Sequence, residues 1–141
     1  MRAAFASVLL LGACATPSSL SPAERLAGCW INRDSDGAVT MRWLPHRERP
    51  GVLTGDKLVY GADGGTRNAR FSLEPSEAGS SLCEIGADEA AVRCWMVAEG
   101  QGGSLEGGRA FIDASADRLR ISIIGDGPDR LIFSGRRDGC D

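Results

Sequence analysis

Residues 118–123 read Arg-Leu-Arg-Ile-Ser-Ile, a stretch in which polar and apolar side chains alternate without a break. A period of two places Leu119, Ile121 and Ile123 on one face of an extended chain and the polar side chains on the other. Residues 39–43, Val-Thr-Met-Arg-Trp, repeat the alternation. This pattern is typical of a β-strand that buries one face and exposes the other, so both stretches are predicted to be strands of an antiparallel sheet.

Short apolar or alternating runs of this kind recur along the chain, separated by residues that favour turns. Such runs, each a candidate strand, lie at residues 29–32, 38–44, 52–60, 66–73, 82–85, 91–98, 109–114, 118–124 and 130–134. Residues 34–37, 61–65 and 125–128, which lie between runs, combine Gly with Asp as hairpin turns do. No stretch is long enough for the helix that a parallel crossover requires, which excludes a parallel α/β fold. The sequence therefore predicts an all-β fold, a single antiparallel up-and-down barrel of eight or nine strands, with a two-sheet sandwich as the alternative.

The sequence Ser21-Pro22-Ala23-Glu24 predicts the start of a short helix ahead of the first strand. The serine and the glutamate form a capping box, and proline suits the first helical position. Gly28 is a natural stop, so we expect the helix to cover residues 22–27.

The residues after this helix, Gly28-Cys29-Trp30, resemble the G-x-W with which lipocalins and other members of the calycin superfamily open their barrel. In those proteins an arginine at the end of the last strand packs across the tryptophan and closes the barrel base. The resemblance implies that Arg136 or Arg137 takes this role, with the guanidinium on the indole face. In a regular last strand Arg137 shares a face with the apolar Leu131 and Phe133, so we favour Arg137.

Three motifs, in the order G-C-W, W-x-P and G-x-x-x-G, resemble an uncharacterised bacterial family of lipocalin-like domains. They are Gly28-Cys29-Trp30, Trp43-Leu44-Pro45 and Gly51-Val52-Leu53-Thr54-Gly55. The chain departs from that family's pattern in two places. Residues 40–42 contain no acidic side chain, and there is no His-Asp-Phe stretch near Phe111 or Phe133. The resemblance therefore implies the fold and carries no activity with it.

The composition is that of one globular domain. The chain has 141 residues, 43% hydrophobic and 25% charged, and we expect the lipocalin-like barrel domain at residues 21–141. The formal net charge of −3 argues against non-specific binding of nucleic acid.

Residues 1–13 are predicted to be a secretory signal, with Arg2 as its positive start and an apolar run at 3–11 that is too short to span a bilayer. The sequence Leu11-Gly12-Ala13-Cys14 resembles the lipobox of bacterial lipoproteins. The resemblance implies that Cys14 becomes the lipidated N-terminus and that residues 14–20 tether the domain to the membrane.

Position 15 is alanine rather than aspartate, which by the same resemblance favours the outer membrane, with the domain facing the periplasm. Residues 15–20 reach at most about 20 Å, which keeps the domain near the bilayer. Two alternatives remain open. Ala13-Cys14-Ala15 also fits the A-x-A site of ordinary secretion, and the apolar run also fits a short buried helix.

Four cysteines remain in the domain once Cys14 is assigned to lipid: Cys29, Cys83, Cys94 and Cys140. An even set in a small exported domain indicates two disulfides, and the absence of a C-x-x-C motif argues against a zinc or thioredoxin-type site. Three pairings are possible. The simplest is nested, with Cys83 joined to Cys94 across a short stretch and Cys29 joined to Cys140 across nearly the whole domain.

The large side chains Trp30, Met41, Trp43, Tyr60 and Trp95 are candidates for lining a ligand cavity, although core packing explains them equally well. The interior of a small barrel is either filled by side chains or holds one small ligand. We therefore predict that the protein binds a small, partly apolar molecule without catalysis. The alternative is a structural or protein-interaction lipoprotein of the cell envelope with a filled barrel.

An enzyme is the least favoured class. The single histidine, His46, lies in a polar loop bounded by prolines, and no nucleophile motif accompanies it, so we interpret it as a solvated loop side chain. Asp34 and Asp36 begin like a calcium loop, but the later ligands are absent and a hairpin turn is favoured. The glycine-rich residues 100–103 are interpreted as a loop near the barrel mouth. No cofactor and no metal are predicted.

Overall fold

The structure is a computed structural model that describes residues 20–34, 37–98, 107–125 and 127–140. The predicted signal, the lipidation site Cys14 and nearly all of the tether lie outside these residues, as do Asp36 and the glycine-rich residues 100–103. Among the described residues, no helix is long and apolar enough to cross a membrane.

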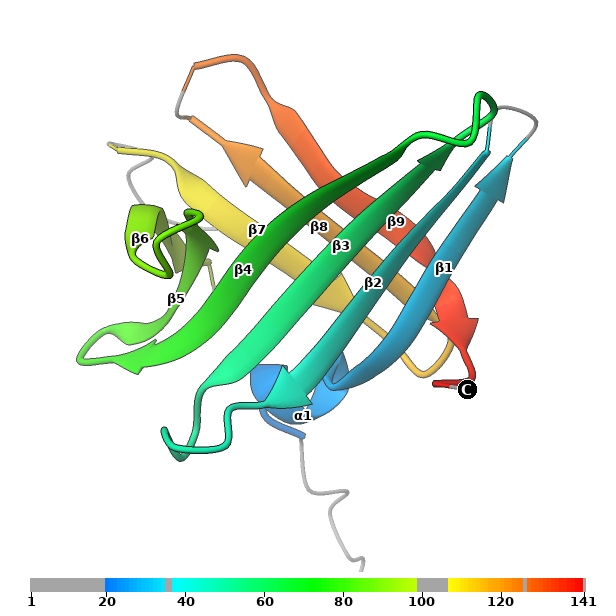
Figure 1. The fold of residues 1–141 in the computed structure, drawn as a ribbon. Helices are drawn as coiled ribbons and strands as arrows, with labels where there is room; N and C mark the ends of the chain where they lie inside the picture. The colour runs from blue at the N-terminus through cyan, green and yellow to red at the C-terminus, as the bar shows by residue number, and fades with distance from the viewer. Residues whose placement is uncertain (1–19, 35–36, 99–106, 126, 141) are drawn as a thin grey trace, which may run out of the picture.

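The described chain forms one short helix and nine strands, and the strands close into a single barrel (Figure 1). This confirms the prediction of an all-β, single-barrel fold. The elements are α1 (Pro22–Leu26), β1 (Gly28–Asp34), β2 (Gly37–Pro45), β3 (Leu53–Gly61), β4 (Thr66–Ser76), β5 (Gly79–Ile85), β6 (Ala91–Val97), β7 (Arg109–Ala114), β8 (Arg118–Ile124) and β9 (Arg130–Asp138). Each strand covers a run that the sequence predicts, and several extend into the adjoining turns.

One pair of neighbouring strands departs from the predicted antiparallel arrangement. Met96 and Val97 of β6 pair in parallel with Arg109 and Ala110 of β7, whereas all the other neighbouring strands are antiparallel. The barrel is therefore up-and-down except at this point. A tight hairpin turn joins only antiparallel strands, and no such turn joins this pair, because β6 ends at Val97 and β7 begins at Arg109.

The helix α1 lies at one end of the barrel, which we call the base (Figure 1). Its predicted capping box is present: the backbone N–H of Glu24 donates to Ser21 Oγ at 3.2 Å, and that of Ser21 donates to Glu24 Oε2 at 2.8 Å. The hydrogen bond from the side chain of Ser21 lowers the pKa of Glu24 most, and the hydrogen bond from the Ser21 backbone lowers it further. At the other end of α1, the carbonyl of the buried Leu26 accepts the indole N–H of Trp30 at 2.9 Å, which fixes the helix to β1.

Cross-strand register identifies the side chains that share the barrel interior. Trp30 pairs with Met41, Met41 with Lys57, and Lys57 with Ala69, so these four side chains lie on one face across β1–β4. Trp30 and Met41 are each 1% exposed and belong to the hydrophobic core, so this face is the interior. The core side chains include Leu26, Trp30, Met41, Trp43, Leu53, Phe71, Leu73, Leu82, Trp95, Leu119, Ile121 and Phe133.

The position of Trp43 in this core depends on the glycine opposite it. Gly55 pairs with Trp43, and a Cβ atom on Gly55 would lie 2.7 Å from the indole ring. The ring therefore occupies the space over Gly55, and Trp43 is fully buried. This gives the second glycine of the G-x-x-x-G motif a packing role.

The first and last strands close the barrel, and the expected arginine stacks on the expected tryptophan. Trp30 pairs directly with Arg137, and the guanidinium carbon of Arg137 lies 4.1 Å from the centroid of the Trp30 ring. The same guanidinium donates to the carbonyls of Ala116, Ala27 and Arg25 at 2.9, 3.1 and 3.2 Å. The predicted role of Arg137 in closing the base is confirmed.

The prediction that Leu131 faces the interior is wrong. Leu131 is 53% exposed, whereas Ile132 and Phe133 are both buried. The strand has a bulge here, because Phe133 pairs with Ile121 while Leu131 pairs with Ser122. The extra residue, Ile132, reverses the alternation, which a regular period cannot predict. Positions beyond the bulge keep the predicted face.

Both predicted disulfides are present, which confirms the nested pairing. Cys83 and Cys94 are directly opposite each other on β5 and β6, with Cα atoms 4.0 Å apart. Cys29 on β1 is joined to Cys140, just beyond β9, with Cα atoms 5.3 Å apart. Two disulfides in a small domain indicate an oxidising compartment, of the kind that exported domains occupy.

Candidate functional site

The structure does not gather the predicted cavity residues around one enclosed space. Trp30, Met41 and Trp43 are at most 1% exposed and pack within the hydrophobic core. Tyr60 is 43% exposed and lies on the outer wall of the barrel rather than inside it. Trp95 is buried and borders a separate pocket.

Tyr60 instead lines a groove of about 300 Å³ on the outer wall, beside the Cys29–Cys140 disulfide. The cause is the alternation of β3. Because Lys57 occupies the interior face, Leu58 and Tyr60 are placed on the outer wall. Side-chain polarity alone predicts the reverse, with the aromatic ring inside and the lysine outside.

Trp95 borders a pocket of about 320 Å³ between β6 and the turn that joins β8 to β9. We call this the Trp95 pocket; its lining residues are Arg93, Trp95, Ile123, Pro128, Asp129 and Arg130. The β8–β9 turn lies at the end of the barrel opposite α1 (Figure 1), so the pocket lies away from the base.

Two guanidinium groups lie over the ring of Trp95. The guanidinium carbons of Arg93 and Arg130 are 5.9 and 5.2 Å from the ring centroid, within the range of a cation–π contact. Arg130 also pairs with Glu84, with Nη2 and Oε2 3.2 Å apart. The pocket thus combines an aromatic side chain and aliphatic neighbours with two positive charges and the one negative charge of Asp129. This net positive composition suits a molecule with an apolar part and an anionic group.

Lys57 adds a further cation from inside the barrel. It belongs to β3, yet its ammonium donates to the carbonyl of Ile132 on β9 at 2.5 Å. Because β3 and β9 are not neighbours, the side chain crosses the interior to reach the bulge. Burial lowers the pKa of Lys57, and the positive charges of Arg130 and Arg67 lower it further. Lys57 is therefore close enough to Arg130, which lines the Trp95 pocket, for their positive charges to interact.

One buried donor has no acceptor within the described part of the chain. The indole N–H of Trp43 is buried and forms no hydrogen bond there, in contrast to that of Trp30, which donates to Leu26. A buried polar group without a partner costs about 1–3 kcal/mol.

His46 is part of the turn between β2 and β3. Its Nδ1 accepts the backbone N–H groups of Glu48 and Arg49 at 3.1 and 3.2 Å, so it stabilises the turn. Asp34 pairs with Gly37 at the end of β1, as expected for a hairpin. Across residues 20–34, 37–98, 107–125 and 127–140, no group of three or more His, Cys, Asp or Glu side chains is placed to hold a metal ion.

The sequence did not single out Lys57, Arg93 or Arg130 as site residues. Charged side chains in an alternating strand normally indicate the exposed face, so nothing in the sequence marks Lys57 as an interior residue. The signal that assigns Lys57 to the interior is its position directly opposite Met41. That register is set by the pairing of the two strands and cannot be read from either strand alone.

Comparisons of this chain with family models, with curated proteins and with solved structures find no match. The resemblances to bacterial lipoproteins and to the calycin superfamily therefore stay predictions.

Proposed function

We propose that this protein is a non-catalytic binding module of the cell envelope that takes a small, partly apolar anion in the Trp95 pocket. The observation that carries the proposal is the pair of guanidinium groups, from Arg93 and Arg130, over the ring of Trp95 in a pocket of about 320 Å³. This volume lies in the range of small-molecule sites, roughly 300–1,000 Å³. The apolar part of the ligand would contact Ile123 and Pro128, and its anionic group would bind a guanidinium.

The charges around the pocket favour an anion over a cation. Arg130 and Arg67 each lie close enough to Lys57 for their positive charges to add to the effect of burial in lowering the pKa of Lys57. The carboxylate of Glu84 offsets part of this charge through its ion pair with Arg130. A bound anion would offset more of the repulsion between these positive side chains. The same positive charges would in turn stabilise the bound anion.

Decanoate is a suitable probe because it joins an apolar chain to one carboxylate. We expect saturable binding, measured by tryptophan fluorescence, and a decrease in affinity of about tenfold or more in Arg130→Gln, because a hydrogen bond to a charged group contributes about 1.5–3 kcal/mol. Arg42→Gln is the matched control, because Arg42, like Arg130, pairs with a carboxylate but lies outside the Trp95 pocket. We expect it to change the affinity by less than about twofold.

Decyltrimethylammonium has the same chain and the opposite charge, and we expect it not to bind. The proposal is wrong if it binds as well as decanoate, or if Arg130→Gln leaves decanoate affinity unchanged. Thermal unfolding of each variant identifies any loss of affinity that comes from loss of the fold. Mass spectrometry of the purified protein under non-denaturing conditions is an independent test, since it detects a molecule that copurifies.

The proposal includes a lipid anchor at Cys14, in the outer membrane with the domain facing the periplasm. We expect Cys14→Ser to move the protein from the membrane fraction to the soluble fraction, because several acyl chains are needed for firm anchoring. Fractionation followed by a salt wash and immunoblotting measures this, with Thr16→Ser as a control that stays in the membrane fraction. A Cys14→Ser protein that still sediments with membranes would contradict the lipid anchor.

The alternative is a structural or protein-interaction lipoprotein, and one observation favours it. The core around Trp30, Met41 and Trp43 is filled by side chains, so a ligand has access only outside that part of the interior. A Trp95 pocket that binds neither probe, in a protein that copurifies with no small molecule, would support this alternative.

A further inference from the structure

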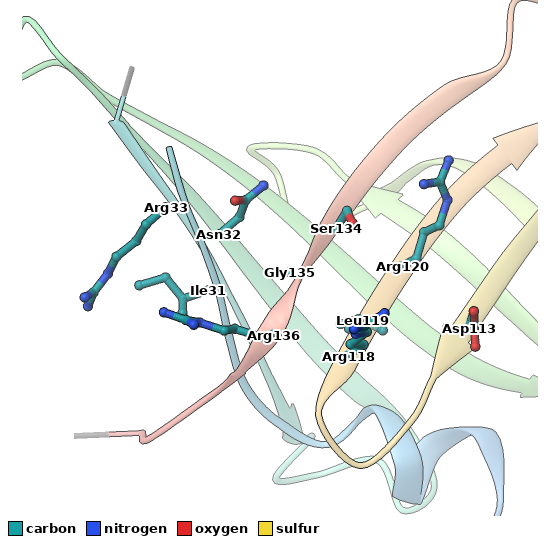
Figure 2. Close-up of a pocket in the computed structure, with 10 residues that line it drawn as sticks. All are labelled: Ile31, Asn32, Arg33, Asp113, Arg118, Leu119, Arg120, Ser134, Gly135 and Arg136. Carbon is teal, nitrogen blue, oxygen red and sulfur yellow. The ribbon is translucent and has the colours of Figure 1, made fainter. Parts of the chain in front are cut away.

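The outer wall of the barrel carries a groove of about 590 Å³ that is distinct from the Trp95 pocket (Figure 2). We call it the arginine groove, because Arg33, Arg118, Arg120 and Arg136 line it, together with the carboxylate of Asp113. In Figure 2, Arg118 and Arg120 rise from β8, Arg136 from β9 and Arg33 from β1. Four positive charges and one negative charge thus share one face of a chain whose formal net charge is −3.

Nearby carboxylates do not neutralise these arginines. Among the ion pairs formed by the described residues, none includes Arg33, Arg118, Arg120 or Arg136. Asp113 is directly opposite Arg120 across β7 and β8, yet the two form no ion pair. The groove therefore presents guanidinium donors that remain available to a ligand.

The opposite part of the wall is different. Arg42 on β2 and Arg70 on β4 also point outward, but Asp56 lies between them on β3, with an oxygen 3.7 Å from a nitrogen of each. Unpaired arginines are therefore not a general property of this barrel surface. They are concentrated where the groove lies.

The register of the strands places positive side chains of the arginine groove next to each other, so that they repel when no anion is bound. Arg118 and Arg136 are directly opposite each other on β8 and β9, and like charges in that position destabilise a sheet. Ser134 is directly opposite Arg120, and its small side chain leaves space beside the guanidinium groups. An anion held there would remove the repulsion and accept several hydrogen bonds at once.

We propose that the arginine groove binds more than one phosphate group at a time. The planar guanidinium donates two parallel hydrogen bonds to a phosphate, a geometry that lysine cannot provide. Arginines on three strands would contact phosphates at separate points along the groove. Soluble polyphosphate compounds carry these phosphate groups in one molecule, and adjacent headgroups of anionic lipids present them side by side on a membrane surface. The experiment distinguishes these two sources.

The first assay is calorimetric titration of the full chain with sodium tripolyphosphate. We expect saturable binding and a decrease in affinity of about tenfold or more in the double variant Arg118→Gln/Arg136→Gln. The matched control, Arg42→Gln/Arg70→Gln, removes the same charge from the paired part of the wall. We expect it to change the affinity by less than about twofold. The groove variant should unfold at the same or a higher temperature, because the substitution removes a like-charge pair.

The second assay is cosedimentation with vesicles of phosphatidylcholine, with and without phosphatidylglycerol. Tripolyphosphate binding that is lost in the groove variant and kept in the control identifies a soluble phosphate ligand. Groove-dependent binding that is confined to the phosphatidylglycerol vesicles identifies the lipid headgroup. The proposal is overturned if neither probe binds, or if both double variants weaken binding equally. Both variants leave Trp95 and Arg130 in place, so decanoate binding reports separately on the Trp95 pocket.

Discussion

Replacement of Trp30 by alanine is expected to lower the free energy of unfolding by about 3–5 kcal/mol. Trp30 is 1% exposed, so truncation leaves a cavity within the core. The change also removes the indole hydrogen bond to Leu26 and the aromatic partner of the Arg137 guanidinium. Urea denaturation followed by circular dichroism measures the effect.

Two further variants separate the contributions to this loss. Leu131→Ala also removes an apolar side chain, but one that is 53% exposed rather than buried. We expect it to lower the free energy of unfolding by less than about 1 kcal/mol. A double-mutant cycle of Trp30→Ala with Arg137→Met should give a coupling energy of about 0.5–2 kcal/mol for the stacked pair. If Trp30→Ala costs less than about 1 kcal/mol, closure of the base does not depend on this contact.

Removal of the Cys29–Cys140 disulfide in Cys29→Ser/Cys140→Ser is expected to cost about 2–5 kcal/mol of unfolding free energy. The bond joins residues 111 apart in sequence, whereas Cys83 and Cys94 are 11 apart. A disulfide that closes a longer loop restricts the unfolded chain more, and the entropic model puts the difference between the two bonds at about 2 kcal/mol.

We expect Cys83→Ser/Cys94→Ser to lose less unfolding free energy than Cys29→Ser/Cys140→Ser. Denaturation curves of the two double variants and the parent, recorded without reductant, give both losses on one scale. An equal or larger loss in Cys83→Ser/Cys94→Ser would show that the long loop contributes no additional stability, and the entropic account would fail for this protein.

Periodicity and turn chemistry were enough to predict the nine strands and the single barrel. Each strand has a local signal, and the capping box at Ser21 marks the helix that precedes them. Closure was also predictable, because a barrel that begins at Trp30 and ends near Arg137 brings these two residues together. The Cys29–Cys140 disulfide follows from the same closure.

The features that the sequence did not reveal depend on register. The bulge at Ile132 and the parallel pairing of β6 with β7 arise from how strands meet, which no single stretch of sequence specifies. For the same reason the interior position of Lys57 was not predicted. The arginine groove was missed because its side chains come from three strands, and their residues lie far apart in the chain.

Pairing of β1 with β9 makes the order of synthesis matter for folding. Cys29, Trp30 and Ile31 gain their partners at Asp138, Arg137 and Arg136 only after the whole intervening sheet has been made. Contacts so distant in sequence raise the contact order and slow the search for the native state. Until β9 arrives, the partly assembled sheet has the unpaired edges β1 and β8, which can associate with other chains. Completion of the chain and protection of these edges are therefore a single event, and a chain interrupted before β9 is left open to aggregation and proteolysis.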